Sequence, residues 1–402
     1  MIPFSPPYIR EEAITEVIDT LKSGWITTGP KTKLFEKKLA EYCGNPATLC
    51  VNSATFGLEL ILRWFGVQEG DEVIVPAYTY TATASVILHV GAKPIMVDVN
   101  QKDFNIDIEK LKGAITERTK VIIPVDFGGF PVDIDKIWDI ITSKGIAKFF
   151  KPRTDKQRQL GRILLMVDSA HSLGAVYKNK RTGSLADVSV FSFHAVKNLT
   201  TAEGGAIALN LPHPFDNQKV YNELNILSLH GQTKDALSKT KLGGWRYDII
   251  YPGYKGNMTD IQASLGLVAL KYYQKETLPK RKYIFERYSE KLSKYSWAQI
   301  PVYKDDIRES SYHIYALRIK GIDEQQRDKI IQRIYEQGVA VNVHFQPLPL
   351  LTAYKKLGYN IKDYPIAYKN YECEISLPVY ETLDDESIEI VIEAVINAVN
   401  SL

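Results

Sequence analysis

Apolar positions follow helical spacing at the start of the chain and then alternate between strand and helix spacing. Ile14, Val17, Ile18 and Leu21 lie at i, i+3, i+4 and i+7, which predicts a helix that ends near Gly24. Short apolar runs separated by helical stretches come next. These runs predict strands at 71–76, 94–98, 119–124, 163–167, 188–193 and 205–209, with a helix at 81–90. This alternation predicts an α/β fold with a mostly parallel central sheet covered by helices, in which ligands bind beyond the carboxyl ends of the strands.

The pattern changes after residue 253. Helical spacing dominates from 260 to about 293, and strand signals return at 315–319 and 340–344. A final helix places Ile388, Val391, Ile392, Val395 and Val399 on one face, and residues 382–385 match a capping box with Asp in place of Glu. We therefore expect a large domain at 1–255 and a smaller α+β domain at 256–402.

One segment has the composition of an insertion. Residues 144–162 carry seven basic side chains and one acid, Asp155. Runs of like charge are usually solvated, so we expect a surface loop, with the inserted part at about 148–160.

Composition narrows the class of protein. A chain of 402 residues with 45% hydrophobic and 24% charged residues is expected to be globular with two domains. The net charge of +3 gives no concentrated basic face for nucleic acid, and no apolar run is long enough to span a membrane. We expect no signal peptide and no metal site. The three cysteines match no disulfide or zinc pattern, so we expect a cytoplasmic protein.

The densest chemical signal is the segment 191–205, which contains His194 and Lys197 just after a predicted strand. A lysine at the edge of a sheet can be desolvated, which favours the nucleophilic neutral amine over the ammonium. Such an amine can form a Schiff base with an aldehyde cofactor. Taken alone, a lysine in a turn is more often simply exposed.

About thirty residues upstream, Asp168 ends a buried apolar strand. A carboxylate is costly to bury without a cationic partner, and a protonated pyridine nitrogen would serve as one. The alternative is an aspartate that caps a neighbouring helix. His171, three residues later, could donate to a ring oxygen, although a packing histidine is an equally ordinary role.

Two weaker motifs complete the pattern. Ser53, Ala54 and Thr55 precede an apolar helix, where free backbone N–H groups and the helix dipole favour a phosphate. An ordinary N-cap is the alternative. Tyr80 follows a strand and could lie flat on a cofactor ring, although core packing is the more usual role of such an aromatic.

In this order and approximate spacing, the motifs resemble the DegT/DnrJ/EryC1/StrS family of sugar aminotransferases, which has the fold-type I architecture of enzymes dependent on pyridoxal 5'-phosphate (PLP). The resemblance runs over nearly the whole chain. It includes the segments 24–30, 253–263 and 341–348.

The resemblance implies roles for individual residues. Lys197 would hold PLP as a Schiff base and act in turn as nucleophile and as general acid and base. Asp168 would pair with the pyridinium, His171 would lie near the ring hydroxyl, and Tyr80 would stack on the ring. The phosphate would be held by Ala54, Thr55 and Ser192, together with Asn257 from a neighbouring subunit, which implies a homodimer with shared active sites. Candidate substrate contacts are Thr28, His194, Lys255 and His344, although for Lys255 an exposed structural role is equally plausible.

Residues 193–198, 202–205 and 229–231, which include Lys197 and His230, most resemble the branch that aminates C4 of nucleotide-linked 4-keto sugars. The resemblance implies L-glutamate as donor and a role in the synthesis of surface polysaccharides such as lipopolysaccharide. Gly256 departs from that branch, which usually has an aromatic residue beside Asn257, and the basic insertion is also unusual. Two alternatives stay open. One is a PLP-dependent sugar dehydratase, in which a histidine replaces the lysine. The other is a non-catalytic regulatory protein with the same fold.

Overall fold

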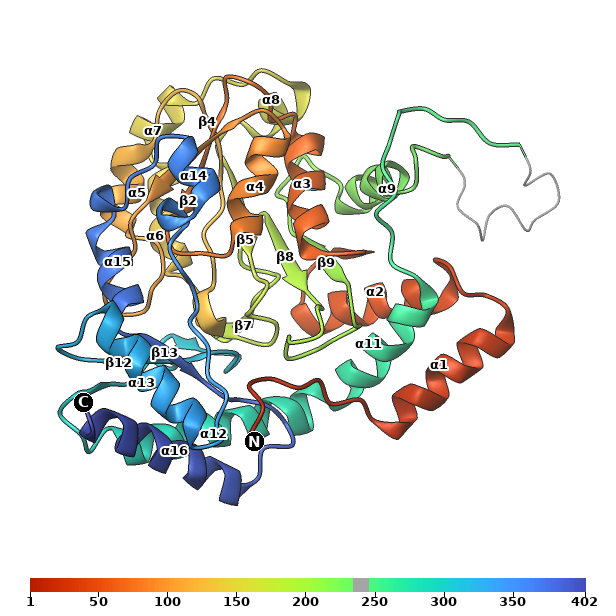
Figure 1. The fold of residues 1–402 in the computed structure, drawn as a ribbon. Helices are drawn as coiled ribbons and strands as arrows, with labels where there is room; N and C mark the ends of the chain where they lie inside the picture. The colour runs from red at the N-terminus through yellow and green to blue at the C-terminus, as the bar shows by residue number, and fades with distance from the viewer. Residues whose placement is uncertain (234–245) are drawn as a thin grey trace.

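The computed structural model describes residues 1–233 and 246–402. Its centre is a seven-stranded sheet in the order β1-β9-β8-β5-β4-β2-β3, and β9 is antiparallel to both of its neighbours while the other pairs are parallel (Figure 1). The strands are β1 Ala47–Val51, β2 Glu72–Pro76, β3 Lys93–Val97, β4 Thr119–Ile122, β5 Leu164–Asp168, β8 Val188–Ser192 and β9 Gly205–Leu209. The predicted mostly parallel α/β sheet is confirmed.

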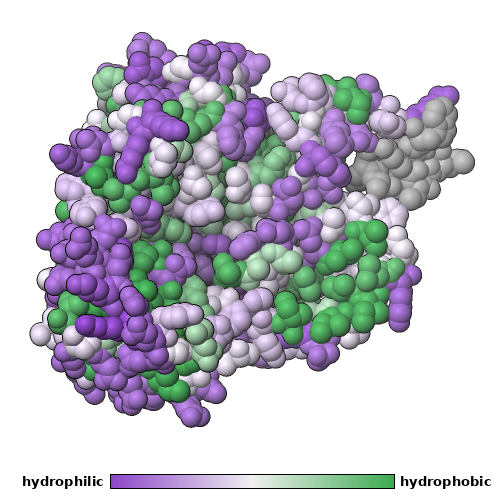
Figure 2. All heavy atoms as spheres, in the orientation of Figure 1, coloured by the Kyte–Doolittle hydropathy of each residue, from purple (hydrophilic) through white to green (hydrophobic). Residues whose placement is uncertain are grey.

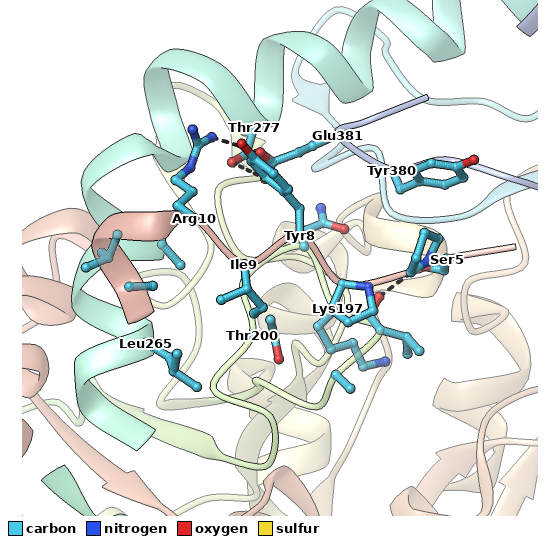
Figure 3. A pocket seen from close by; sticks show the side chains of 18 of the residues that line it. Ser5, Tyr8, Ile9, Arg10, Lys197, Thr200, Leu265, Thr277, Tyr380 and Glu381 are labelled. Atoms are coloured by element: carbon cyan, nitrogen blue, oxygen red, sulfur yellow. Dashed lines mark hydrogen bonds and ion pairs between the residues drawn. The ribbon is translucent and has the colours of Figure 1, made fainter. Parts of the chain in front are cut away.

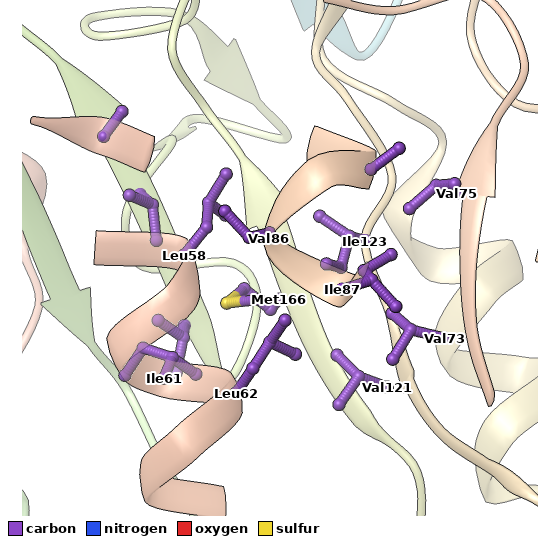
Figure 4. Packing of buried hydrophobic residues seen from close by; sticks show 14 of the residues in the cluster. Leu58, Ile61, Leu62, Val73, Val75, Val86, Ile87, Val121, Ile123 and Met166 are labelled. Carbon is purple, nitrogen blue, oxygen red and sulfur yellow. The ribbon is translucent and has the colours of Figure 1, made fainter. Parts of the chain in front are cut away.

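Helices cover both faces of this sheet. The helices in this part of the chain are α1 Glu11–Ser23, α2 Pro30–Cys43, α3 Ala54–Phe65, α4 Thr81–His89, α5 Ile108–Ala114, α6 Ile134–Thr142, α7 Lys144–Phe149, α8 Asp155–Leu160 and α9 Asn217–Ser228, with a short 3-10 turn η1 at Phe127–Gly129. Of these, α1 packs on the helix Asp260–Tyr272 and not on the sheet. On one face, Leu58 and Leu62 of α3 and Val86 of α4 pack on apolar side chains of β2, β4 and β5 (Figure 4). Burial of each such side chain contributes about 1.5–3 kcal/mol to folding.

The C-terminal part is an α+β unit with its own apolar core. Its antiparallel sheet contains β10 Ala298–Gln299, β12 Tyr315–Ile319 and β13 Glu374–Leu377. A small third sheet contains β6 Val176–Tyr177, β7 Lys180–Arg181 and β11 Arg308–Glu309. The helices are α11 Asp260–Tyr272, η2 Tyr273–Thr277, α12 Leu278–Leu292, α13 Glu324–Glu336, η3 Leu348–Leu350, α14 Thr352–Lys356, η4 Ile361–Asp363, α15 Pro365–Glu372 and α16 Asp385–Asn400. The domain boundary near residue 255 stays a prediction.

Two local predictions about this part are wrong. Residues 340–344 form no strand, because this stretch makes only one isolated bridge, between Asn342 and Ser376 of β13. The last helix begins two residues later than the sequence pattern indicated, since the predicted capping box placed the N-cap at Thr382. Its N-cap is Asp384, whose side chain accepts from the amide of Ser387.

The basic segment lies at the surface and most of its cations are exposed, as expected, but it is not a loop. It forms α7 and α8, and several of its cations pair with acids of other elements. Arg153 pairs with the buried Asp71 at 3.1 Å, and Arg162 pairs with the buried Asp187 at 2.7 Å. Charge composition alone could not show these pairs, because the acidic partners lie far away in the sequence. The segment therefore contacts the end of α3 and the residues just before β2 and β8.

Candidate active site

A cavity of about 410 Å³ lies at the carboxyl ends of the parallel strands. β5 and β8 are neighbours and run parallel, so their last residues, Asp168 and Ser192, reach the same edge. The side chains around the cavity include nine predicted site residues: Ala54, Thr55, Tyr80, Asp168, His171, Ser192, His194, Lys197 and His344. Their proposed roles remain predictions, but the fold brings them to one place.

Lys197 is positioned by a tight turn after β8, in which its amide donates to the carbonyl oxygen of His194 at 2.9 Å. Burial lowers the pKa of the Lys197 amine to about 8, although the charge of Asp168 opposes this shift. A substantial fraction of the amine is therefore neutral near physiological pH. This is the state that a nucleophile or a base requires.

Asp168 faces the same cavity and is almost fully buried, with 6% of its surface exposed. One carboxylate oxygen accepts from Thr83 Oγ1 at 2.8 Å, and the other accepts from the amide of Ala170 at 3.1 Å. Burial raises the pKa of this carboxyl group, and these two neutral donors oppose the rise only in part. A cation placed against Asp168 would keep it ionised, so the site fits the protonated ring nitrogen of PLP.

A pair of histidines forms one wall of the cavity. The rings of His171 and His313 lie 4.5 Å apart between centroids. The amide of Gly128 donates to Nδ1 of His171 at 3.3 Å, and this bond assigns the ring proton to Nε2. Burial lowers the pKa of both imidazoles well below the usual range, so both rings are neutral.

The N-terminus of α3 provides the place for a phosphate. Ser53 Oγ caps the amide of Phe56 at 3.1 Å, and the first intrahelical bond runs from Gly57 to the carbonyl of Ser53. The amides of Ala54 and Thr55 come before that bond and lie at the positive end of the helix dipole. A Cβ atom at Gly205 would lie 2.5 Å from the amide nitrogen of Ala54, so this glycine allows β9 to approach the helix end.

Aromatic side chains close the cavity. Tyr80 is 61% exposed, and its ring centroid lies 6.0 Å from that of Phe345. Phe345 also stacks on His171, with centroids 5.8 Å apart and ring planes inclined by 20°. The ring of Tyr80 is thus largely exposed, and the stacking role that the resemblance implies stays a prediction.

The N-terminal segment, residues 5–10, passes close to Lys197 (Figure 3). Ser5 Oγ donates to the carbonyl of Val196 at 3.4 Å, and Phe4 stacks on His344 with ring centroids 5.5 Å apart. Arg10 anchors this segment through Glu381 at 2.9 Å. The first ten residues therefore form part of the wall around Lys197.

Three predicted residues do not line the cavity of their own chain. Asn257 Nδ2 donates to Thr28 Oγ1 at 2.6 Å, and Lys255 Nζ donates to Asn257 Oδ1 at 2.5 Å. The side chains of Thr28, Lys255 and Asn257 are thus hydrogen-bonded to one another outside the cavity. Beside it, a Cβ atom on Gly256 would lie 2.1 Å from the ring of Phe56, so an aromatic ring from α3 fills the space next to that glycine.

Several cavity residues were missed by sequence reasoning. They include Phe4, Ser5, Thr79, Glu203, His313 and Phe345. His313 lies two residues before a predicted strand, whereas the sequence argument looked for site residues after strands. Phe4 had no comparable signal, because its place depends on the pairing of Ile2 with Val339, more than 300 residues away. No group of three potential metal ligands occurs in the part of the chain that the structure describes.

Comparison with known proteins gives one consistent result. The family model for DegT/DnrJ/EryC1/StrS aminotransferases matches residues 7–150 and 155–396. The spore coat polysaccharide biosynthesis protein SpsC of Bacillus subtilis is 36% identical over 401 residues, covering 98% of this chain and 96% of SpsC. An uncharacterized protein of Methanocaldococcus jannaschii is 40% identical over 400 residues, covering 98% and 97% of the two chains.

Solved structures agree with these matches. "Putative sugar aminotransferase Spr1654" from Streptococcus pneumoniae, in its PMP form, has a TM-score of 0.96 and 50% identity, with full coverage of both chains. A PLP form of the same protein has a TM-score of 0.94. The aminotransferase PseC of Helicobacter pylori, involved in the biosynthesis of pseudoaminic acid, has a TM-score of 0.84 and 28% identity over 99% of both chains. None of the helices that the structure describes could cross a membrane.

We expect Lys197→Ala to abolish covalent attachment of PLP and to reduce turnover by about a thousandfold or more, because both nucleophile and base are removed. After borohydride reduction, mass spectrometry should find PLP on the native chain and none on the variant. Lys120→Ala is the matched control, because burial also lowers the pKa of Lys120 but this residue does not line the cavity. Labelling of the Lys197→Ala chain would show that another amine holds PLP.

We expect Asp168→Asn to lower the rate at least tenfold, equivalent to about 1.4 kcal/mol, because a neutral amide cannot keep the ring nitrogen protonated. Steady-state kinetics on PLP-loaded protein measures this loss. Asp126→Asn is the matched control. Asp126 is a buried carboxylate, but it binds Ser172 at 2.6 Å and does not line the cavity. Equal losses in the two variants would mean that Asp168 has only a structural role.

Proposed function

The chain belongs to the DegT/DnrJ/EryC1/StrS aminotransferase family, and on this premise we propose that it transfers the amino group of L-glutamate to C4 of a nucleotide-linked 4-keto sugar. That it is a PLP-dependent sugar aminotransferase follows from the family and the solved relatives. The observation that carries the proposal is the arrangement of Lys197 and Asp168 in one cavity. The donor, the nucleotide and the C4 position rest on the resemblance of the segments around Lys197 and His230.

PLP, when bound, supplies an electron sink for the carbon that loses or gains a proton. The side chains of this chain supply the rest. The neutral fraction of Lys197 can accept a proton, and the resulting ammonium can return it, because its pKa of about 8 lies close to physiological pH. Asp168 keeps a negative charge against the cofactor ring, while Thr83 and Ala170 fix the orientation of its carboxylate.

The surroundings of the cavity suit a sugar. His194, His313 and His344 present imidazole rings that can exchange hydrogen bonds with hydroxyl groups, and Phe345 and Tyr80 offer flat apolar surfaces. We place the product in surface polysaccharide or glycan synthesis, where SpsC provides a named relative. We place the reaction in the cytoplasm, since Cys43, Cys50 and Cys373 are all unpaired.

We also propose a homodimer in which Asn257 reaches the phosphate of the partner subunit, with Lys255 and Thr28 near the substrate. Two observations support this arrangement. These three residues are joined to each other outside their own cavity. In addition, α1 exposes Ile14, Ile18 and Leu21 in an apolar surface that Figure 2 shows at the lower right. An apolar face of this kind is typical of a subunit interface.

The sugar assignment predicts a specific half-reaction. Enzyme treated with L-glutamate should lose its visible absorption and regain it with a nucleotide-linked 4-keto-6-deoxy sugar, because the amino group then leaves the protein. NMR of the product should place nitrogen on C4. The 3-keto isomer is the matched control substrate and should restore little colour. Amination at C3, or dehydration without amino transfer, would contradict the proposal.

The shared site predicts complementation between two inactive chains. Lys197→Ala removes the amine, and Asn257→Asp sets a carboxylate against the phosphate dianion. When the two variants are mixed, activity should partly return, because a mixed dimer contains one site with both residues native. Sedimentation should give a mass of about twice 45.5 kDa.

Each variant mixed with itself is the control for this experiment and should remain inactive. Subunit exchange has to be verified with differently tagged chains. No recovery despite exchange, or a monomeric mass at working concentration, would count against the shared site without affecting the assignment of Lys197.

A further inference from the structure

A fully buried carboxyl group, Glu374, lies behind the cavity wall and has no part in the chemistry described above. It is the first residue of β13, and its side chain contacts His344 in two ways. Oε2 accepts from the backbone amide of His344 at 2.9 Å. Oε1 accepts from Ser376 Oγ at 2.5 Å, and the same Oγ lies 2.9 Å from Nδ1 of His344. A continuous chain of hydrogen bonds thus runs from the buried acid to a ring that lines the cavity.

The geometry restricts how protons can be arranged in this chain. The backbone N–H of His344 is always a donor, so Oε2 must remain an acceptor, and any proton on Glu374 sits on Oε1. Ser376 has one hydroxyl proton. It can donate to Glu374 and accept from Nδ1–H, or accept from Glu374 and donate to Nδ1. These two arrangements require opposite tautomers of a neutral His344.

We propose that Glu374, Ser376 and His344 form a relay that takes one proton from the active-site cavity and returns it. When Nε2 of His344 accepts a proton from the cavity, the Nδ1 proton passes to Ser376 Oγ, and the Ser376 proton passes to Glu374. The net change is one O–H bond formed on Glu374 and one tautomer change of His344. The imidazole is neutral at both ends of the process, and each step conserves protons.

The electrostatic surroundings favour this division of roles. Burial raises the pKa of Glu374 to about 8, and burial together with the nearby Lys197 lowers the pKa of His344 to about 4. The carboxyl group is therefore the one that titrates near physiological pH, while the imidazole only transmits the proton. Other charged or titratable groups that face Glu374 are Arg318 of β12, Arg327 of α13, Tyr78 after β2 and the adjacent Cys373.

Two further contacts hold His344 in place for this role. Tyr78 donates to the carbonyl oxygen of His344 at 2.8 Å, and Phe4 stacks on its ring. The backbone of Ser376 exchanges two hydrogen bonds with Asn342, at 2.7 and 3.1 Å, and so fixes β13 beside the histidine. Because the ring is held on all these sides, a proton change alters its hydrogen-bonding character without requiring movement. Nε2 of His344 is an acceptor when Glu374 is ionised and a donor when Glu374 is protonated.

The tautomer of His344 gives a direct test. PLP-loaded enzyme with 15N-labelled histidine is followed by solid-state NMR from about pH 6 to about pH 10, a range that spans the shifted acid. The chain has seven histidines, and His344→Gln identifies the signals. We expect His344 to carry its proton on Nε2 at low pH and on Nδ1 at high pH, with a midpoint near the Glu374 pKa of about 8. A tautomer that does not change over this range would overturn the proposal.

Glu374→Gln sharpens the test. The glutamine carbonyl must face the amide of His344, so its NH2 group meets Ser376, whose hydroxyl then donates to Nδ1. We expect the Nε2–H tautomer at every pH. The matched control is Glu36→Gln, because Glu36 is a buried carboxyl group that accepts from the amide of Cys50 at 3.0 Å and does not line the cavity. It should leave the His344 titration unchanged.

Ser376→Ala removes only the hydroxyl group and provides a second variant if Glu374→Gln does not fold. Without this hydroxyl group, ionisation of Glu374 should no longer change the tautomer of His344. The pH-dependent tautomer transition should therefore disappear. A transition that persists in either variant would mean that another group drives it. These experiments need no sugar or amino donor, so their outcome is independent of the proposed substrate. They also avoid the activity profile, in which Lys197 titrates near the same pH.

Discussion

The active-site cavity depends on the burial of two groups of opposite charge in one small space. Desolvation favours the neutral forms of both Lys197 and Asp168, while the attraction between them favours the charged forms. Desolvation is the larger effect at each residue. The amine is consequently reactive near neutral pH, and the carboxylate gains stability from any cation placed against it. Both properties would be lost in an open, hydrated site, so the surrounding walls are part of the chemistry.

The sheet topology creates that burial. Asp168 and Ser192 end neighbouring parallel strands, and the turn after β8 brings Lys197 back toward the same edge. The start of α3 reaches this edge too, because Gly205 lets β9 pass close to Ala54. The C-terminal unit then covers the edge with His313 and His344. The sheet alone thus positions the groups that act on the cofactor, and the second unit supplies the groups that face the substrate.

The sequence was sufficient for six of the seven strands of the central sheet, but β1 was not predicted. Asp168 and Lys197 could be found because each comes after a strong apolar run, and Ala54 because it precedes an apolar helix. Both kinds of signal are local. The strand predicted at 340–344 failed because its partner is one isolated bridge rather than a ladder. The basic segment was expected to be a loop but forms two short helices, and its ion pairs to residues about 25 to 80 positions away could not be read from local charge. Phe4 and Glu374 were not found, since their roles come entirely from tertiary contacts.

Residues that lie far apart in the sequence meet in the wall of the cavity. Phe4 and Ser5 lie on it together with Leu377 and Val379. A ribosome makes the chain from the N-terminus at about 5–20 residues per second, so the first wall residues emerge long before the last. The parallel sheet can form while synthesis continues, but the enclosed cavity cannot. Lys197 therefore gains its full surroundings only after residues 377–379 have joined the fold, and a product truncated before them would lack that part of the wall.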